Sequence, residues 1–168
     1  DAMATAPTDY SNAAQNLSAA AAGVVLSSLD TLANDDFLLV GSVLPIRGIL
    51  VDVNAANINA SVLAVHYWTG AWTAVAALSD GTDSPAGTTL GADGNITWTV
   101  PTDAVAAKLS TIYTSSPNFN LRDSSMYWWR LSVSVALDST VTLDRMLAMN
   151  RESSLYLELL SGQVFEEK

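Results

Sequence analysis

One histidine, His66, provides the only imidazole of a 168-residue chain that contains no cysteine. A Ser–His–Asp site or a zinc centre would therefore have to use this residue, because thiolate ligands are absent. His66 lies in the run Val62-Leu-Ala-Val-His-Tyr-Trp68, which is rich in the residue types that favour β-strands. A lone histidine in such a run is usually a packing or surface residue, so we expect no catalytic role for it.

Aspartates occur in segments that we expect to be loops, at Asp35-Asp36, at Asp80 and Asp83, and at Asp93. Carboxylate oxygens are ligands that calcium prefers, so the run Asp80-Gly-Thr-Asp83 is a candidate calcium site. Aspartate is also common in turns, because it accepts hydrogen bonds from nearby backbone N–H groups. We expect turns and no bound metal, with calcium binding as the alternative.

Motifs of the common enzyme classes are missing from the sequence. It contains no Gly-x-Ser-x-Gly elbow, no phosphate-binding glycine-rich loop and no dinucleotide-binding fingerprint. A glycosidase needs two carboxyl groups about 5–9.5 Å apart, and no such pair is evident from the sequence. We therefore expect a protein that is not an enzyme and needs no cofactor, with a glycan hydrolase as a disfavoured alternative.

The charge of the chain is strongly acidic, with 17 acidic and 7 basic residues and a formal charge of −10. Nucleic acids and anionic membranes bind clustered Lys and Arg, whereas the basic residues here occur singly, which argues against both partners. No run reaches the roughly 18 apolar residues of a membrane-spanning helix. Only 14% of the residues are charged, against about 25% in ordinary domains. Such a neutral surface favours a protein that other chains cover.

Tryptophan and tyrosine are concentrated around the expected hairpins. By alternation, Trp98 and Trp129 face the core, whereas Trp128 lies on the opposite face, where aromatic side chains often contact another chain. A sugar-stacking platform is the alternative interpretation of these rings. The residues that we expect at an interface are Tyr67, Trp72, Trp128, Leu155, Tyr156, Leu159 and Phe165.

The elements that must position these side chains are predicted mainly by alternation. In Trp129–Leu137 every second residue from Leu131 is apolar, which predicts a strand with one face on a core and the other, including Arg130, in water. The other expected strands are 38–44, 47–53, 61–68, 72–78, 95–100 and 141–144.

Turn residues separate these runs. Thr69-Gly70-Ala71 predicts a hairpin, Asp80–Pro85 and Ala92–Asn95 predict loops, and Asp103–Leu109 is a candidate helical turn. Seven or eight short strands at this spacing predict an all-β fold, an antiparallel β-sandwich of jelly-roll type.

The two ends of the chain differ from its middle. Residues 1–30 lack a strand pattern and are expected to form an N-terminal arm, with a short helix possible over Ala13–Leu29. We expect the sandwich domain over residues 31–148 and a C-terminal strand or arm over residues 149–168. Within the last segment, Ser153–Phe165 has both strand-like and helix-like spacing, and we favour a strand or an extended arm.

A block of short motifs gives the chain a family resemblance. The motifs are Phe37-Leu-Leu-Val-Gly-Ser42, Arg47-Gly-Ile-Leu-Val-Asp52, Tyr67-Trp-Thr-Gly-Ala-Trp72, Asp80-Gly-Thr82, Ile96-Thr-Trp-Thr-Val-Pro101 and Tyr127-Trp-Trp-Arg-Leu131. Together, over about residues 37–148, they resemble a β-sandwich domain of tailed-bacteriophage virion proteins, and most of all the head decoration (cement) proteins.

This resemblance implies a structural virion protein on the outer surface of a capsid, bound to the major capsid protein and trimeric. The same sandwich occurs in tail and fibre proteins, so a carbohydrate-binding or adhesion module of a tail is the alternative. If the ends are arms that order on a partner, removal of residues 1–30 is expected to weaken attachment and leave the sandwich folded.

Overall fold

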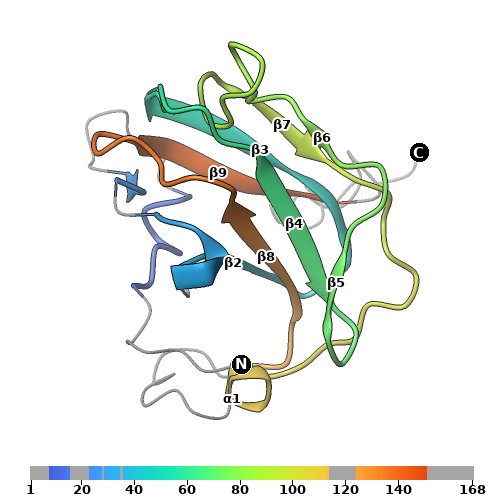
Figure 1. The fold of residues 1–168 in the computed structure, drawn as a ribbon. Helices are drawn as coiled ribbons and strands as arrows, with labels where there is room; N and C mark the ends of the chain where they lie inside the picture. The colour runs from blue at the N-terminus through green and yellow to red at the C-terminus, as the bar shows by residue number, and fades with distance from the viewer. Residues whose placement is uncertain (1–7, 16–22, 28, 35, 114–123, 151–168) are drawn as a thin grey trace, which may run out of the picture.

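The computed structural model describes residues 8–15, 23–27, 29–34, 36–113 and 124–150, which form two antiparallel sheets packed face to face (Figure 1). One sheet has the order β1-β9-β3-β7-β6 and the other β2-β8-β4-β5. The predicted all-β sandwich is confirmed, with nine strands in the described residues. The larger sheet consists of β1 (Val24–Val25), β9 (Thr142–Asn150), β3 (Ile46–Ala55), β7 (Gly94–Thr97) and β6 (Ser79–Asp80).

The smaller sheet consists of β2 (Leu38–Ser42), β8 (Tyr127–Val133), β4 (Leu63–Trp68) and β5 (Trp72–Ala74). The hairpin at Thr69-Gly70-Ala71 is confirmed, because Trp68 pairs with Trp72. Gly70 has a φ of 103°, a backbone conformation that residues with a Cβ atom rarely adopt. Only two short helices occur in the described part of the chain, η1 (Leu32–Asn34) and α1 (Leu109–Ile112). The helical turn expected over 103–109 is thus displaced, because α1 begins only at Leu109, the last residue of that segment.

The core lies between the sheets and contains the side chains that alternation placed there. Trp98 and Trp129 are both buried, and their rings stack with centroids 6.3 Å apart. The indole N–H of Trp98 donates to the carbonyl oxygen of Ile46 at 2.9 Å, so its one polar atom is paired inside the core. The prediction that both tryptophans anchor the sandwich is confirmed.

Part of the expected N-terminal arm belongs to the sandwich. Val24 and Val25 form β1 and pair with β9, so the helix expected over 13–29 is wrong at these positions. Val24, Leu26 and Leu29 are buried in the core. Their apolar side chains are spaced too irregularly for a sequence pattern to reveal a strand of two residues.

The strand expected over 141–144 continues much further, to Asn150, past the predicted end of the sandwich at residue 148. The interface candidates Leu155, Tyr156, Leu159 and Phe165 lie outside the described residues. Among the helices of the described residues, none is long and apolar enough to cross a membrane.

Candidate functional site

The outer face of the smaller sheet collects the side chains that could do chemistry. In β4 and β8 every second residue points away from the core, and the register pairs His66 with Arg130 on this side. Trp68 faces Trp72 across the hairpin, and Trp128 lies opposite Gly41 of β2. Alternation therefore brings the only histidine, an arginine and three tryptophans to one surface.

This face is covered by another part of the same chain, residues 105–113, which we call the covering segment. The N–H of Val105 donates to the carbonyl oxygen of Trp68 at 2.9 Å, and Ala107 and Met126 exchange backbone hydrogen bonds of 2.9 and 3.1 Å. The indole N–H of Trp128 donates to the carbonyl oxygen of Ala107 at 2.8 Å. The expectation that this face of β8 lies in water is wrong, because the covering segment excludes water from it.

A second apolar cluster forms under the covering segment. Ile112, Tyr113 and Trp128 are buried in it, and partly buried neighbours complete it: Phe37, Leu39, Trp68, Trp72, Ala107, Leu109 and Met126. Arg130 is only 8% exposed. Its guanidinium carbon lies 4.7 Å from the ring centroid of Trp72 and 5.7 Å from that of Phe37. These cation–π contacts stabilise a charge that is otherwise costly to bury.

Two titratable side chains on this covered face, His66 and Tyr113, are shifted toward their neutral forms. Burial lowers the pKa of His66, and the positive charge of Arg130 lowers it further. Burial raises the pKa of Tyr113 to about 12, although the nearby Arg130 opposes this change. His66 is therefore neutral at pH 7, and within the described residues its buried Nδ1 atom has no hydrogen-bond partner. The geometry indicates packing roles for these groups.

The predicted interface aromatics are used mainly inside the chain. Tyr67 faces the core, and its hydroxyl donates to Oδ1 of Asp103 at 2.9 Å. Trp128 is on the outer side of its strand, as expected, but it is buried below the covering segment. Trp72 is partly buried and packs edge-on against Trp68, with ring centroids 5.4 Å apart. None of these three rings is strongly exposed.

The Asp80–Asp83 loop is organised by its own hydrogen bonds. Oδ1 of Asp80 accepts from the backbone N–H and the hydroxyl of Thr82, at 2.9 and 2.6 Å. Its Oδ2 atom accepts from the hydroxyl of Thr89 at 2.6 Å, and Oδ1 of Asp83 accepts from the N–H of Thr88 at 2.6 Å. The carboxylates thus have the turn-forming role that we expected of them. In the described residues no three His, Cys, Asp or Glu side chains gather as a metal site.

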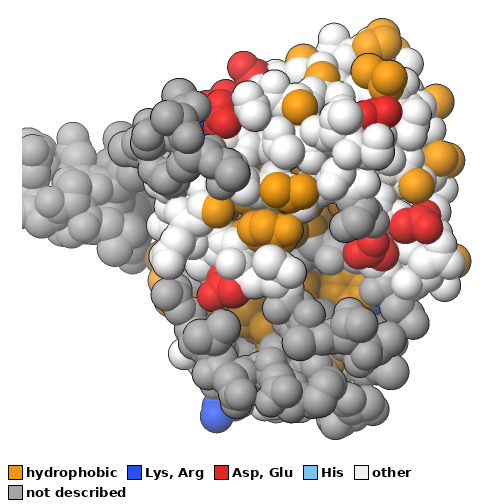
Figure 2. Space-filling view, turned by 90° about the vertical axis from the view of Figure 1, so that its left-hand side faces the viewer, with side chains coloured by type: hydrophobic (Ala, Val, Ile, Leu, Met, Phe, Trp, Pro, Cys, Tyr) orange, Lys and Arg blue, Asp and Glu red, His pale blue; other side chains and the backbone are white. Residues whose placement is uncertain are grey.

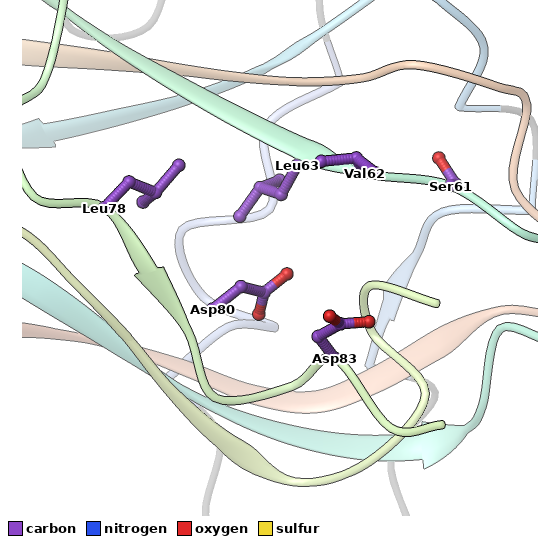
Figure 3. A pocket seen from close by; sticks show the side chains of 6 residues that line it. All are labelled: Ser61, Val62, Leu63, Leu78, Asp80 and Asp83. Atoms are coloured by element: carbon purple, nitrogen blue, oxygen red, sulfur yellow. The ribbon is translucent and has the colours of Figure 1, made fainter. Parts of the chain in front are cut away.

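A shallow pocket lies beside this loop (Figure 3). Its volume is about 160 Å³, and it is lined by the apolar side chains of Val62, Leu63 and Leu78, with Ser61, Asp80 and Asp83 completing it. Both carboxylates border the open space in Figure 3. The space is about the size of one amino-acid side chain.

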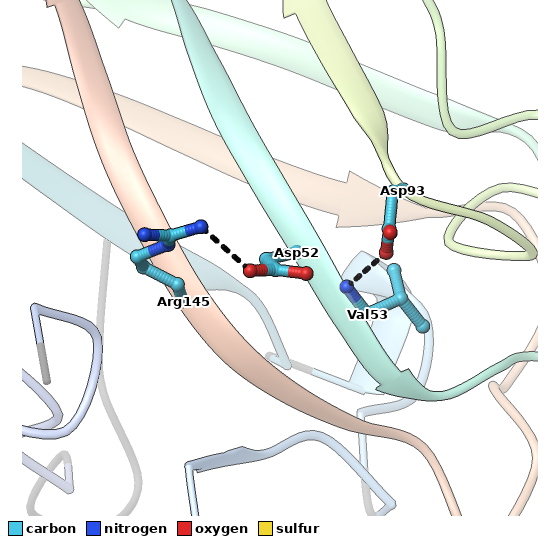
Figure 4. A network of polar contacts seen from close by, with 4 residues as sticks. All are labelled: Asp52, Val53, Asp93 and Arg145. Carbon is cyan, nitrogen blue, oxygen red and sulfur yellow. Dashed lines mark hydrogen bonds and ion pairs between the residues drawn. The ribbon is translucent and has the colours of Figure 1, made fainter. Parts of the chain in front are cut away.

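Asp93, another of the expected loop aspartates, supports the larger sheet (Figure 4). Its Oδ1 atom accepts from the N–H of Val53 at 2.7 Å, and next to it Arg145 donates to Oδ2 of Asp52 at 2.8 Å. Arg145 and Asp52 are cross-strand neighbours of β9 and β3. These contacts help to hold β3 and β9 in register, and they are typical of hydrogen bonds and ion pairs at a protein surface.

Three exposed aliphatic residues lie in two hydrogen-bonded segments just outside β4 and β8, and we call these residues the aliphatic end. It consists of Ile58, Val62 and Val135, which are 77%, 63% and 49% exposed. The N–H of Ser134 donates to the carbonyl oxygen of Val62 at 3.0 Å, which holds the two segments side by side.

Sequence reasoning missed the aliphatic end. Alternation placed Val135 in the core, but β8 ends at Val133, and Val135 lies beyond the paired strand with an exposed side chain. Ile58 stands in a run of small neutral residues that gives no strand signal. The one available signal in the sequence is Ile58 itself, an aliphatic residue between two asparagines in an expected loop, which indicates an exposed apolar side chain.

Comparisons with protein-family models, with curated proteins and with solved structures find no match for this chain.

Proposed function

We propose that this protein is a structural virion component, which decorates a bacteriophage capsid by binding the outer surface of the major capsid protein, as a homotrimer. The family resemblance of residues 37–148 suggests this role. The chemistry of the site is compatible with it, because His66, Arg130 and Asp80 are engaged in packing and turn formation. Such a protein works by binding and needs no reactive group.

The observation that carries the proposal is the aliphatic end. Exposed Ile58, Val62 and Val135 cost free energy in water and gain it when a partner covers them. Figure 2 shows one side of the molecule, where hydrophobic and neutral groups predominate, acidic groups are scattered and basic groups appear only in the lower half. A neutral surface of this kind loses little hydration energy when it is buried.

The proposed mechanism is stabilisation of the assembled shell. A ligand that binds only the assembled lattice makes separation of the shell subunits less favourable. A trimer would present three aliphatic ends at once, so that weak contacts reinforce each other through a high effective concentration.

The direct test is the copy number of this chain in purified particles, measured by quantitative mass spectrometry against the major shell protein. We expect a ratio near one per shell subunit. A few copies per particle would instead favour the tail or fibre module. Addition of sugars with the fluorescence of Trp68 and Trp72 as readout would then be the next measurement, since these rings are the partly exposed pair.

A substitution in the aliphatic end tests the surface itself. Val62→Asp places a charge where the proposal needs an apolar contact, so affinity for shells that lack this chain should fall at least about tenfold, or about 1.4 kcal/mol. The measurement is co-sedimentation with such shells.

Val43→Asp is the matched control for this substitution. Val43 is 72% exposed, and it follows β2 at the opposite end of the smaller sheet, since β2 and β4 run in the same direction beside β8. We expect unchanged binding for this variant. Equal binding by both variants would contradict the role of the aliphatic end.

A further inference from the structure

The pocket beside the Asp80–Asp83 loop combines an apolar wall with two carboxylates. Val62, Leu63 and Leu78 form the wall, and the carboxylates of Asp80 and Asp83 lie across the open space from it (Figure 3). A long basic side chain has the matching chemistry, because its methylene groups cover apolar surface while its end carries a positive charge. The pocket, at about 160 Å³, has room for one such side chain.

Buried threonines hold the carboxylate of Asp80 in place. The hydroxyl groups of Thr82 and Thr89 each donate to it at 2.6 Å, and these threonines are 0% and 1% exposed. Oδ1 of Asp83 accepts from the N–H of Thr88 at 2.6 Å. Because a carboxylate has about four acceptor positions, Asp83 keeps capacity for a further donor. Groups that are already fixed lose little conformational freedom when a ligand binds.

The negative charge of this loop has no basic partner among the described residues. Arg145 pairs with Asp52, and no Lys or Arg of the described ranges forms an ion pair with Asp80 or Asp83. The whole chain has a formal charge of −10, so its field also attracts cations. A positively charged group is therefore complementary to the pocket, whereas a carboxylate or a phosphate is repelled.

Val62 connects the pocket to the aliphatic end, because it belongs to both and is 63% exposed. The residue before it, Ser61, is buried, and its hydroxyl donates to the carbonyl oxygen of Val135 at 2.8 Å. This hydrogen bond fixes the pocket relative to the aliphatic end. A partner that covers Val62 therefore has side chains at the mouth of the pocket.

We propose that the pocket takes a lysine side chain of the partner protein, with its methylene groups against the apolar wall and its ammonium group beside Asp80 and Asp83. Lysine fits better than arginine. A guanidinium needs two oxygens in one plane, and those of Asp80 are engaged by the threonines, whereas an ammonium is a compact point charge. The inference rests on the proposed function, since it assigns a lysine beside an apolar contact to the shell protein that this chain covers.

A titration with Nα-acetyl-lysine methylamide tests the pocket on the isolated, isotopically labelled chain by NMR. We expect saturable shifts of the amides of Leu63 and Asp83, with a Kd of about 1–10 mM for a ligand of this size. Two control probes separate the stem from the charge. The Nε-acetylated form keeps the stem without the charge, and methylammonium has the charge without the stem. Each should bind at least about tenfold more weakly.

Equal binding of the lysine probe and either control probe would overturn the proposal. The absence of shifts up to about 50 mM of the lysine probe would overturn it as well.

Asp83→Asn tests the carboxylate itself. Asparagine keeps an oxygen for the N–H of Thr88 and loses the charge, so affinity for the lysine probe should fall at least about fivefold. Asp103→Asn is the matched control, because Asp103 accepts from the hydroxyl of Tyr67 near the far end of β4. Its affinity should be unchanged, and equal affinities of the two variants would overturn the proposal. All titrations use the isolated chain, so failure to bind lysine is distinguishable from absence of the chain in particles.

Discussion

At the scale of single residues, His66 links pH to the stability of the covered face. Its folded pKa lies below the ordinary value of 6.5, because burial and the charge of Arg130 disfavour the imidazolium. Below pH 6.5 the unfolded chain therefore binds a proton that the folded chain resists. The contribution of His66 to the free energy of unfolding should be constant above pH 6.5. It should decrease as the pH falls from 6.5 toward the pKa of His66 in the folded protein.

Urea unfolding between pH 5 and 8 measures this dependence, with His66→Gln as the control. Since the chain has one histidine, the variant should lose the part of the pH dependence that lies near pH 6. The carboxylates are unchanged in the variant and titrate at lower pH. Identical pH profiles for the two proteins would contradict the burial of His66 beside Arg130.

At the scale of elements, Gly41 of β2 determines how the outer face packs. A Cβ atom at this position would lie 2.6 Å from the nearest ring carbon of Trp128, whose indole is fixed by its hydrogen bond to Ala107. Gly41→Ala should therefore destabilise the fold by about 1–3 kcal/mol, the usual cost of overpacking. Denaturant unfolding measures this loss.

A double-mutant cycle tests whether contact with the Trp128 ring causes the loss of stability in Gly41→Ala. In the background of Trp128→Leu, where the ring is gone, Gly41→Ala should cost much less. If the cost is the same in both backgrounds, the ring contact is not the reason for the glycine.

The elements of the sandwich could be predicted wherever burial follows alternation. Trp129 was assigned to the core correctly because it lies in a strand with one core face, and Trp98 because it continues the alternation of β7 by one residue. The burial of Arg130 could not be predicted in this way, since the covering segment is far from β8 in sequence and has no periodic pattern. For the same reason, the sequence does not reveal that the covering segment buries Trp128. Long-range contacts of irregular segments leave no local signal, and the candidate site consists largely of such contacts.

At the scale of the whole molecule, the boundaries of the sandwich depend on a few apolar side chains near the N-terminus. Tyr10 and Ala14 pack against the core, and the carbonyl oxygen of Ala14 accepts from the N–H of Met146 at 2.8 Å. These contacts join a segment with no strand pattern to β9. The expectation that residues 1–30 can be removed from a folded sandwich therefore conflicts with the packing.

Two truncations separate folding from attachment. Removal of residues 1–30 deletes β1 and takes Val24, Leu26 and Leu29 from the core. At roughly 1.5–3 kcal/mol for each buried side chain, the loss is about 5 kcal/mol or more, comparable with the whole stability of a small domain. This variant should lose its cooperative thermal transition. Removal of residues 1–7 deletes none of these contacts and should leave the transition unchanged, so binding to capsid shells can be measured on it. A folded sandwich after removal of residues 1–30 would show that β1 contributes little and that the sandwich begins later in the chain.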